Sequence, residues 1–171
     1  MTVLIPWQSE RRVACQLREM PPSAIQMRFD LTSRARTSFR SVLSEDLDWK
    51  PFPAFPPSVR LAVVVGRPSE AGPYTIRVRV PHGVKLMPHR HPEDRVYTGN
   101  CRASFYIGLG DRFDRRQAAG RIRLGSVIVL PGNTPHFHWA KSSEYVTQVT
   151  AIGPLGIEYV NATDDPRSHR P

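Results

Sequence analysis

The sequence predicts an all-β protein, organised as a small antiparallel sandwich or barrel. The clearest strand is 74–80, where large apolar residues alternate with polar ones, the period of a strand with one buried face. Short apolar runs follow at close spacing, separated by loops rich in Gly, Pro, Asn or Asp, as in antiparallel barrels. Further strands are expected at residues 61–65, 96–98, 104–108, 122–124, 126–130, 137–140 and 145–152.

The chain of 171 residues divides into one domain and two terminal segments. Residues 1–44 are rich in Arg and Ser and contain Pro21 and Pro22, which predicts a flexible basic N-terminal extension with at most a short helix. This extension is either an arm for an acidic partner or an artefact of the assigned start site. Residues 45–163 are expected to form the β-barrel domain, and 164–171 a polar tail.

The domain begins with a proline-rich segment, residues 44–60, with Trp49, Phe52 and Phe55 interleaved among the prolines. Proline excludes helix and central strand. Because three aromatic side chains would serve no purpose on a free linker, we expect an extended strap packed against the domain.

The charge of the chain is +9, which raises the question of nucleic-acid binding. The charge is spread along the chain, with about +4 in residues 1–44 and about +5 in the rest, and no dense basic run occurs. We therefore expect a solvated basic surface and no nucleic-acid partner. Cys15 and Cys101 are not expected to form a disulfide, and no apolar run is long enough for a membrane span. With no secretory signal at the N-terminus, a cytoplasmic protein is expected.

Four of the six histidines form two His-x-His pairs on expected strands: His89 with His91, and His136 with His138. Residues two apart in a strand point to the same face, so each pair can meet one ion. Neutral imidazole is the commonest metal-ligand side chain. The two pairs therefore predict a metal site, although histidines at strand ends also occur as ordinary polar residues.

Both pairs lie in segments that resemble the two motifs of the cupins, a superfamily of small jelly-roll barrels. Gly83, five residues, then His89, Arg90 and His91 match the start of the first motif. Gly125, five residues, Pro131 and then His136 match the second motif. The resemblance spans roughly residues 45–163 and is nearest to single-domain bacterial cupins with the string HPEDRVYT and to the cupin module of anti-sigma regulators. It implies a cupin-type jelly-roll barrel.

The chain departs from this pattern at one metal ligand. The glutamate of the first motif would fall at position 95 or 96, where this sequence has Arg95 and Val96. Glu93 and Asp94 lie earlier and are optional carboxylate ligands, and His138 is an alternative fourth ligand. The candidate metal ligands are therefore His89, His91, His136, Glu93, Asp94 and His138.

The resemblance implies a divalent transition metal (Fe, Zn, Mn or Ni) and a small-molecule ligand. A site without its carboxylate favours an anionic substrate. The expected function is a metal-dependent enzyme of the dioxygenase or isomerase class, depending on the metal. The alternative is a non-catalytic metal or ligand sensor or binding module, as in the anti-sigma cupins. No catalytic residue is assigned. A homodimer is expected from the open strands of a small barrel. The expected substrate-pocket residues are Tyr97, Tyr106, Trp139 and Gln148.

Overall fold

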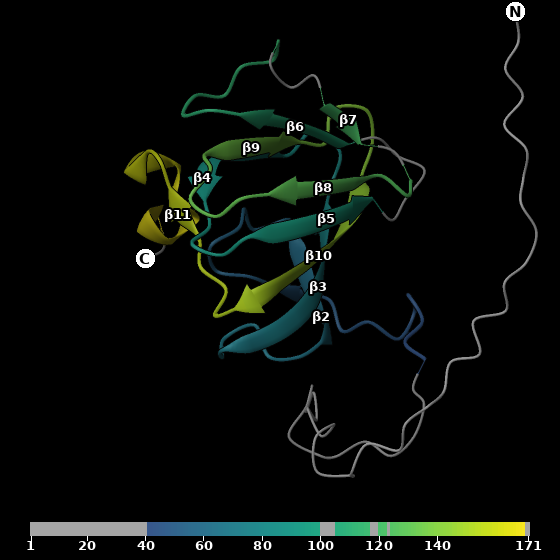
Figure 1. Cartoon of the computed structure of the whole chain (residues 1–171). Coiled ribbons are helices and arrows are strands. Elements are labelled where there is room, and N and C mark those ends of the chain that lie inside the picture. The colour runs from purple at the N-terminus through teal and green to yellow at the C-terminus, as the bar shows by residue number, and fades with distance from the viewer. Residues whose placement is uncertain (1–40, 100–104, 117–119, 123, 170–171) are drawn as a thin grey trace, which may run out of the picture.

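The computed structural model describes residues 41–99, 105–116, 120–122 and 124–169 (Figure 1). Both cysteines and almost all of the predicted extension 1–44 lie outside these residues, so the expectations about them remain predictions. Within the described residues the structure is built from strands, and the predicted all-β class is confirmed.

Eleven described strands form two antiparallel sheets. The six-stranded sheet has the order β1 (Lys50–Pro51), β2 (Arg60–Val65), β3 (Gly72–Val80), β10 (Tyr145–Gly153), β5 (Arg95–Gly99) and β8 (Val127–Leu130). The five-stranded sheet has the order β11 (Glu158–Tyr159), β4 (Lys85–Arg90), β9 (His136–Trp139), β6 (Phe105–Leu109) and β7 (Gly120–Ile122). Strands that are adjacent in one sheet, such as β3 and β10, are far apart in the sequence. The chain between them crosses repeatedly from one sheet to the other (Figure 1).

The hydrophobic core lies between the two sheets. On β3 the predicted alternation is confirmed, because Tyr74, Ile76, Val78 and Val80 are buried while the residues between them are half-buried. The same period occurs on β10, where the buried residues begin with Tyr145. Burial of large aliphatic and aromatic side chains on these neighbouring strands provides the main favourable contribution to folding.

The proline-rich segment packs against this core, as expected for a strap. Phe55 and Val59 are buried, and the rings of Phe52 and Phe55 meet edge to face with centroids 5.2 Å apart. The hydroxyl of Tyr159 on β11 donates a hydrogen bond of 2.8 Å to the carbonyl of Ala54. The strap is thereby tied to the end of the chain as well as to the core.

The short elements differ most from the sequence prediction. The two-residue strands β1 and β11 were not expected, because two residues are too few to show a period. The C-terminal segment, predicted to be a polar tail from residue 164, instead contains 3-10 turns. These are η1 (Ala162–Asp164) and η2 (Pro166–His169). Arg167 holds these turns to the segment before β11 by donating to the carbonyl of Ile157 at 3.2 Å. No helix among the described residues is long and apolar enough to cross a membrane.

The bond between Tyr159 and the strap gives a test of the fold. Tyr159→Phe should lower the free energy of unfolding by about 1–2 kcal/mol, because a buried hydrogen bond to the Ala54 carbonyl is lost. Tyr106→Phe, on the half-exposed outer side of β6, is the matched control and should change it by about 0.5 kcal/mol or less. Chemical denaturation of both variants measures the difference. Equal effects would show that the Tyr159 bond does not hold the strap.

Candidate metal centre

Two adjacent strands bring the four histidines of the His-x-His pairs together. β4 and β9 pair antiparallel, with His89 directly opposite His136. The register shifts between Leu86 and His89, where Pro88 lies in the strand without a backbone donor. His89, His91, His136 and His138 are each at most 4 % exposed. All four imidazoles are thus in the interior of the protein.

Three of these imidazoles form a compact cluster. One ring nitrogen of each of His89, His91 and His136 lies within 4.8 Å of the other two. The ring centroids of His89 lie 4.4 Å from His136 and 5.0 Å from His91. Three nitrogens at such separations can share a single transition-metal ion.

Backbone carbonyl groups determine which nitrogen of each ring is available. Nδ1 of His89 lies 2.6 Å from the carbonyl of Met87, and Nδ1 of His136 lies 2.9 Å from that of Thr134. Nδ1 of His91 lies 2.5 Å from the carbonyl of Gly156. A carbonyl oxygen only accepts, so each Nδ1 carries the proton and each Nε2 keeps its lone pair. This tautomer leaves Nε2 as the nitrogen that can bind a metal, and the carbonyl groups fix the ring orientations.

His138 lies next to the cluster without belonging to it. Its ring centroid is 5.1 Å from that of His136 and 5.8 Å from that of His89. The group of three ligand atoms within 4.8 Å of one another does not include His138. The imidazole instead lines the neighbouring cavity.

The carboxylate of Glu93 is bound by the protein itself. Its Oε1 accepts hydrogen bonds from Nε and Nη2 of Arg95, at 3.0 and 2.5 Å, and from the Tyr74 hydroxyl at 2.8 Å. Its Oε2 accepts from the amide of Gly156 at 3.3 Å. The carboxylate and guanidinium form an ion pair whose side chains are 8 % and 3 % exposed. Glu93 therefore serves here as the partner of Arg95.

The carboxylate of Asp94 links the turns that carry the two histidine pairs. Its Oδ1 accepts a hydrogen bond of 2.6 Å from the amide of Gly132, and the amide of Asn133 donates to the carbonyl of His91 at 2.6 Å. A side chain at Gly132 would place its Cβ 2.4 Å from the carbonyl oxygen of Pro92. The two turns thus need a glycine at 132, and Asp94 lies exposed on their outer side.

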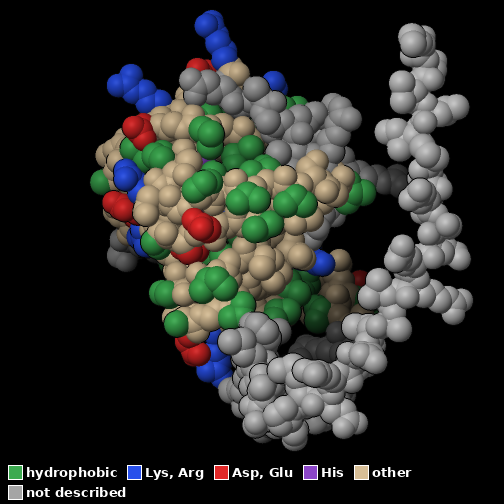
Figure 2. Space-filling model, viewed as in Figure 1, with side chains coloured by type: hydrophobic (Ala, Val, Ile, Leu, Met, Phe, Trp, Pro, Cys, Tyr) green, Lys and Arg blue, Asp and Glu red, His purple; other side chains and the backbone are tan. Residues whose placement is uncertain are grey.

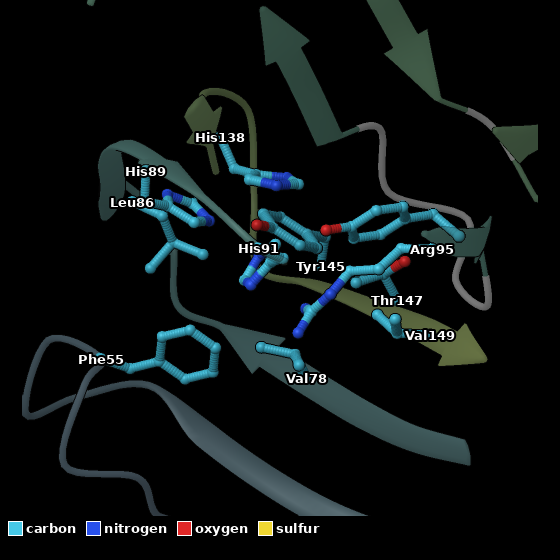
Figure 3. Close-up of a pocket in the computed structure, with 11 residues that line it drawn as sticks. Phe55, Val78, Leu86, His89, His91, Arg95, His138, Tyr145, Thr147 and Val149 are labelled. Atoms are coloured by element: carbon cyan, nitrogen blue, oxygen red, sulfur yellow. The ribbon is translucent and has the colours of Figure 1, made fainter. Parts of the chain in front are cut away.

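A cavity adjoins the cluster between the two sheets. About 290 Å³ of empty space lies in and around it, part of which is open solvent. Figure 3 shows His89, His91 and His138 on one side and Arg95 with Thr147 opposite them. Its lining is completed by Phe55, Val78, Leu86, Tyr97, Tyr145 and Val149. Of the four pocket residues expected from the sequence, only Tyr97 lines this cavity. Its hydroxyl lies 3.4 Å from Nε2 of His136.

The other three expected pocket residues point away from this cavity. Tyr106 and Trp139 are paired across β6 and β9, while the alternate pair Ile107 and His138 faces inward. Trp139 instead has the ammonium group of Lys141 5.4 Å from its ring centroid. Gln148 lies between the inward-facing Thr147 and Val149 and bonds to Arg77 on the outer side. Strand alternation therefore places all three on outward faces.

Burial controls the protonation of the cluster. It lowers the pKa of His136 to about 4, and it lowers the pKa values of His89, His91 and His138 well below their usual range. The cationic Arg95 adds to this effect at every one of these rings. The imidazoles are neutral at physiological pH, as metal binding requires.

Comparison with solved structures identifies the fold. The polyketide cyclase RemF from Streptomyces resistomycificus aligns over 77 % of this chain and 92 % of its own, with 15 % identity and a TM-score of 0.58. An RmlC-like cupin from Ralstonia eutropha aligns over 75 % and 76 %, with 16 % identity and a TM-score of 0.54. The DMSP lyase DddQ from Ruegeria pomeroyi DSS-3 aligns over 67 % and 61 %, with 14 % identity and a TM-score of 0.52.

No protein-family model matches the sequence, and the search of curated proteins found no match. The structural likeness nevertheless shows that this chain has the fold of a bacterial cupin barrel.

The buried imidazoles predict an acid-sensitive metal-free protein. Histidines of the unfolded chain take up protons near pH 6.5, whereas His136 in the folded chain does so near pH 4. Between these values the unfolded state binds more protons, so the free energy of unfolding should fall as the pH drops, by about 3 kcal/mol from His136 alone. Chemical denaturation of chelator-treated protein at a series of pH values from 7.5 to 4.5 measures this change in the free energy of unfolding.

A matched control for this experiment is His82→Asn. His82 is exposed, so its replacement should leave the pH dependence unchanged. His136→Gln should reduce the pH dependence without removing it, because the other three buried histidines still contribute. A wild-type stability that stays constant between pH 7 and 5 would contradict the neutral, buried cluster.

Proposed function

We propose that this chain is a metal-dependent enzyme that acts on a small anionic compound. In this proposal a divalent transition metal, one of Fe, Zn, Mn or Ni, is bound by His89, His91 and His136. The observation that carries it is the set of three buried imidazoles with one nitrogen each within 4.8 Å of the others, every ring fixed by a carbonyl at Nδ1. Such orientation of ligand rings by outer hydrogen bonds is characteristic of metal sites.

The charge balance of the cluster supports an anionic substrate. Its three imidazoles are neutral, and the nearby carboxylate of Glu93 is neutralised by Arg95. A bound divalent ion would thus keep its full charge toward the cavity, and a negatively charged ligand would be the natural counterion.

The ion supplies either Lewis-acid chemistry or oxygen activation, which correspond to isomerase and dioxygenase reactions. The residues of the chain position the substrate and exclude water. Leu86, Val78, Val149 and Phe55 provide an apolar wall, and the Tyr97 hydroxyl lies beside the cluster. Two of the compared structures are named as enzymes, a polyketide cyclase and a DMSP lyase, which is compatible with an enzyme on this barrel.

Replacement of single histidines tests the ligand set. His89→Ala and His136→Ala should each reduce metal binding at least about a hundredfold, because two ligands hold an ion poorly. His138→Ala should weaken it less, since His138 lies outside the three-atom group. Metal content by mass spectrometry and isothermal titration measure the order, with circular dichroism as the control for folding. Full occupancy in both of the first two variants would disprove the site.

A substrate screen separates the enzyme from a sensor. Metal-loaded protein is assayed for oxygen uptake and product formation with diketones, enediols and small carboxylic acids. Turnover that disappears in His89→Ala supports the enzyme. One metal per chain without turnover across the series would instead favour a non-catalytic metal or ligand sensor.

We also propose that the protein is a homodimer joined through the outer side of β5 and β8. β8 is the last strand of the six-stranded sheet, and its Val127 and Val129 are 62 % and 70 % exposed. Val96 on β5 pairs with Val129 and is also exposed. Figure 2 shows hydrophobic side chains across this part of the surface. An edge strand with exposed valines is a ready site for pairing between chains.

A charge on this surface tests the dimer. Val129→Lys should convert a dimer to a monomer in light scattering, because a lysine would be buried in the interface. Thr75→Lys, on the same sheet at β3, is the matched control and should leave the dimer intact. A monomeric wild-type protein would disprove the proposal.

A further inference from the structure

The most unusual side chain in the cavity is the guanidinium of Arg95. It is 3 % exposed, yet it lines the cavity that adjoins the histidine cluster, on the wall opposite His89 (Figure 3). Arg95 also stands where the cupin motif has a glutamate. A buried cation at that position needs an explanation, because burying charge is costly unless the charge is paired.

Its bonds to Glu93 account for only part of the guanidinium. Glu93 is bound through Nε and Nη2, and Nη2 also approaches the Tyr74 hydroxyl at 3.4 Å and the Gly156 carbonyl at 3.5 Å. These nitrogens form one edge of the planar group. The Nη1 amino group, with two further donors, takes part in none of these four bonds. Arg95 also hydrogen-bonds to the Tyr97 side chain, so the ion pair orients the guanidinium and a ligand would share its remaining donors with Tyr97.

The other polar groups of the cavity extend this set of donors. The Tyr97 hydroxyl lies two residues along β5 on the same inward face, and it reaches Nε2 of His136 at 3.4 Å. A guanidinium and a phenol hydroxyl on one wall, facing a metal position on the other, match the oxygens of a carboxylate. The apolar remainder of the wall suits a short carbon chain.

We propose that Arg95 binds the carboxylate of a small organic acid in a subsite beside the histidine cluster. Glu93 holds the guanidinium in place and moderates its charge. The inference rests on the function proposed above and specifies its substrate class, a compound that bears at least one carboxylate. Arg95 is a specificity-determining residue in this scheme. Its side chain is held by Glu93, which does not depend on a metal.

The test uses metal-free protein, so that it does not depend on activity or on the metal. Isothermal titration with malonate, and with the uncharged malonamide as the control ligand, compares wild type with Glu93→Gln and with the double variant Glu93→Gln/Arg95→Gln. Glu93→Gln removes the neutralising charge and should tighten malonate binding by about tenfold. The double variant, which keeps a hydrogen-bonding pair without charge, should lose malonate binding.

Two controls sharpen this experiment. Arg77→Gln removes a positive charge from the outward face of the same sheet and should leave malonate affinity unchanged. Arg95→Lys keeps the charge but loses the planar fork, so it should bind malonate more weakly than wild type. Thermal melts establish that each variant is folded.

The outcomes are decisive in either direction. Malonate binding that is unchanged in the double variant, or malonamide that binds as well as malonate, would overturn the inference. If the double variant does not fold, the affinities of wild type and Glu93→Gln for malonate and malonamide still test the carboxylate subsite. Arg95-dependent malonate binding in a protein that takes up no metal would refute the metal site and leave the carboxylate subsite standing.

Discussion

The antiparallel pairing of β4 with β9 is the constraint on which the rest of the site depends. It places His89 directly opposite His136 and turns both His-x-His pairs to the interior. Four imidazoles in a dry interior are tolerable only when they are neutral and hydrogen-bonded. The carbonyl groups of Met87, Thr134 and Gly156 meet that requirement for three of them. The same bonds leave Nε2 of each ring to bind an ion.

The ion pair of Glu93 and Arg95 is a second interaction that fixes the geometry near the site. Glu93 binds Arg95 and the amide of Gly156, while the carbonyl of Gly156 accepts from His91. A side chain at Gly156 would place its Cβ 2.6 Å from the ring of Pro92. The ion pair, the loop at 156 and the ring of His91 are therefore mechanically coupled. A buried ion pair contributes little net stability, but it fixes the orientation of its two side chains, and a binding site requires such fixed side chains.

Much of the fold was predictable from local pattern. The alternation of 74–80, the short apolar runs and the turn residues determined the all-β class and most strands. The two-residue strands and the 3-10 turns were not predicted, because elements this short show no periodic pattern in the sequence. Tyr106, Trp139 and Gln148 were expected in the pocket as large or polar strand residues. Their face depends on the pairing register, which residue type does not reveal.

The sequence by itself determined the two histidine pairs, their separation along the chain and the face that each pair shares. It also showed that Arg95 stands in place of a glutamate. Only the tertiary structure decided the roles of the two neighbouring carboxylates, because their partners come from distant segments. Glu93 meets Gly156 and Tyr74, and Asp94 meets Gly132. Such contacts follow from chain crossings between the sheets, and the spacing of residues along one strand cannot encode them.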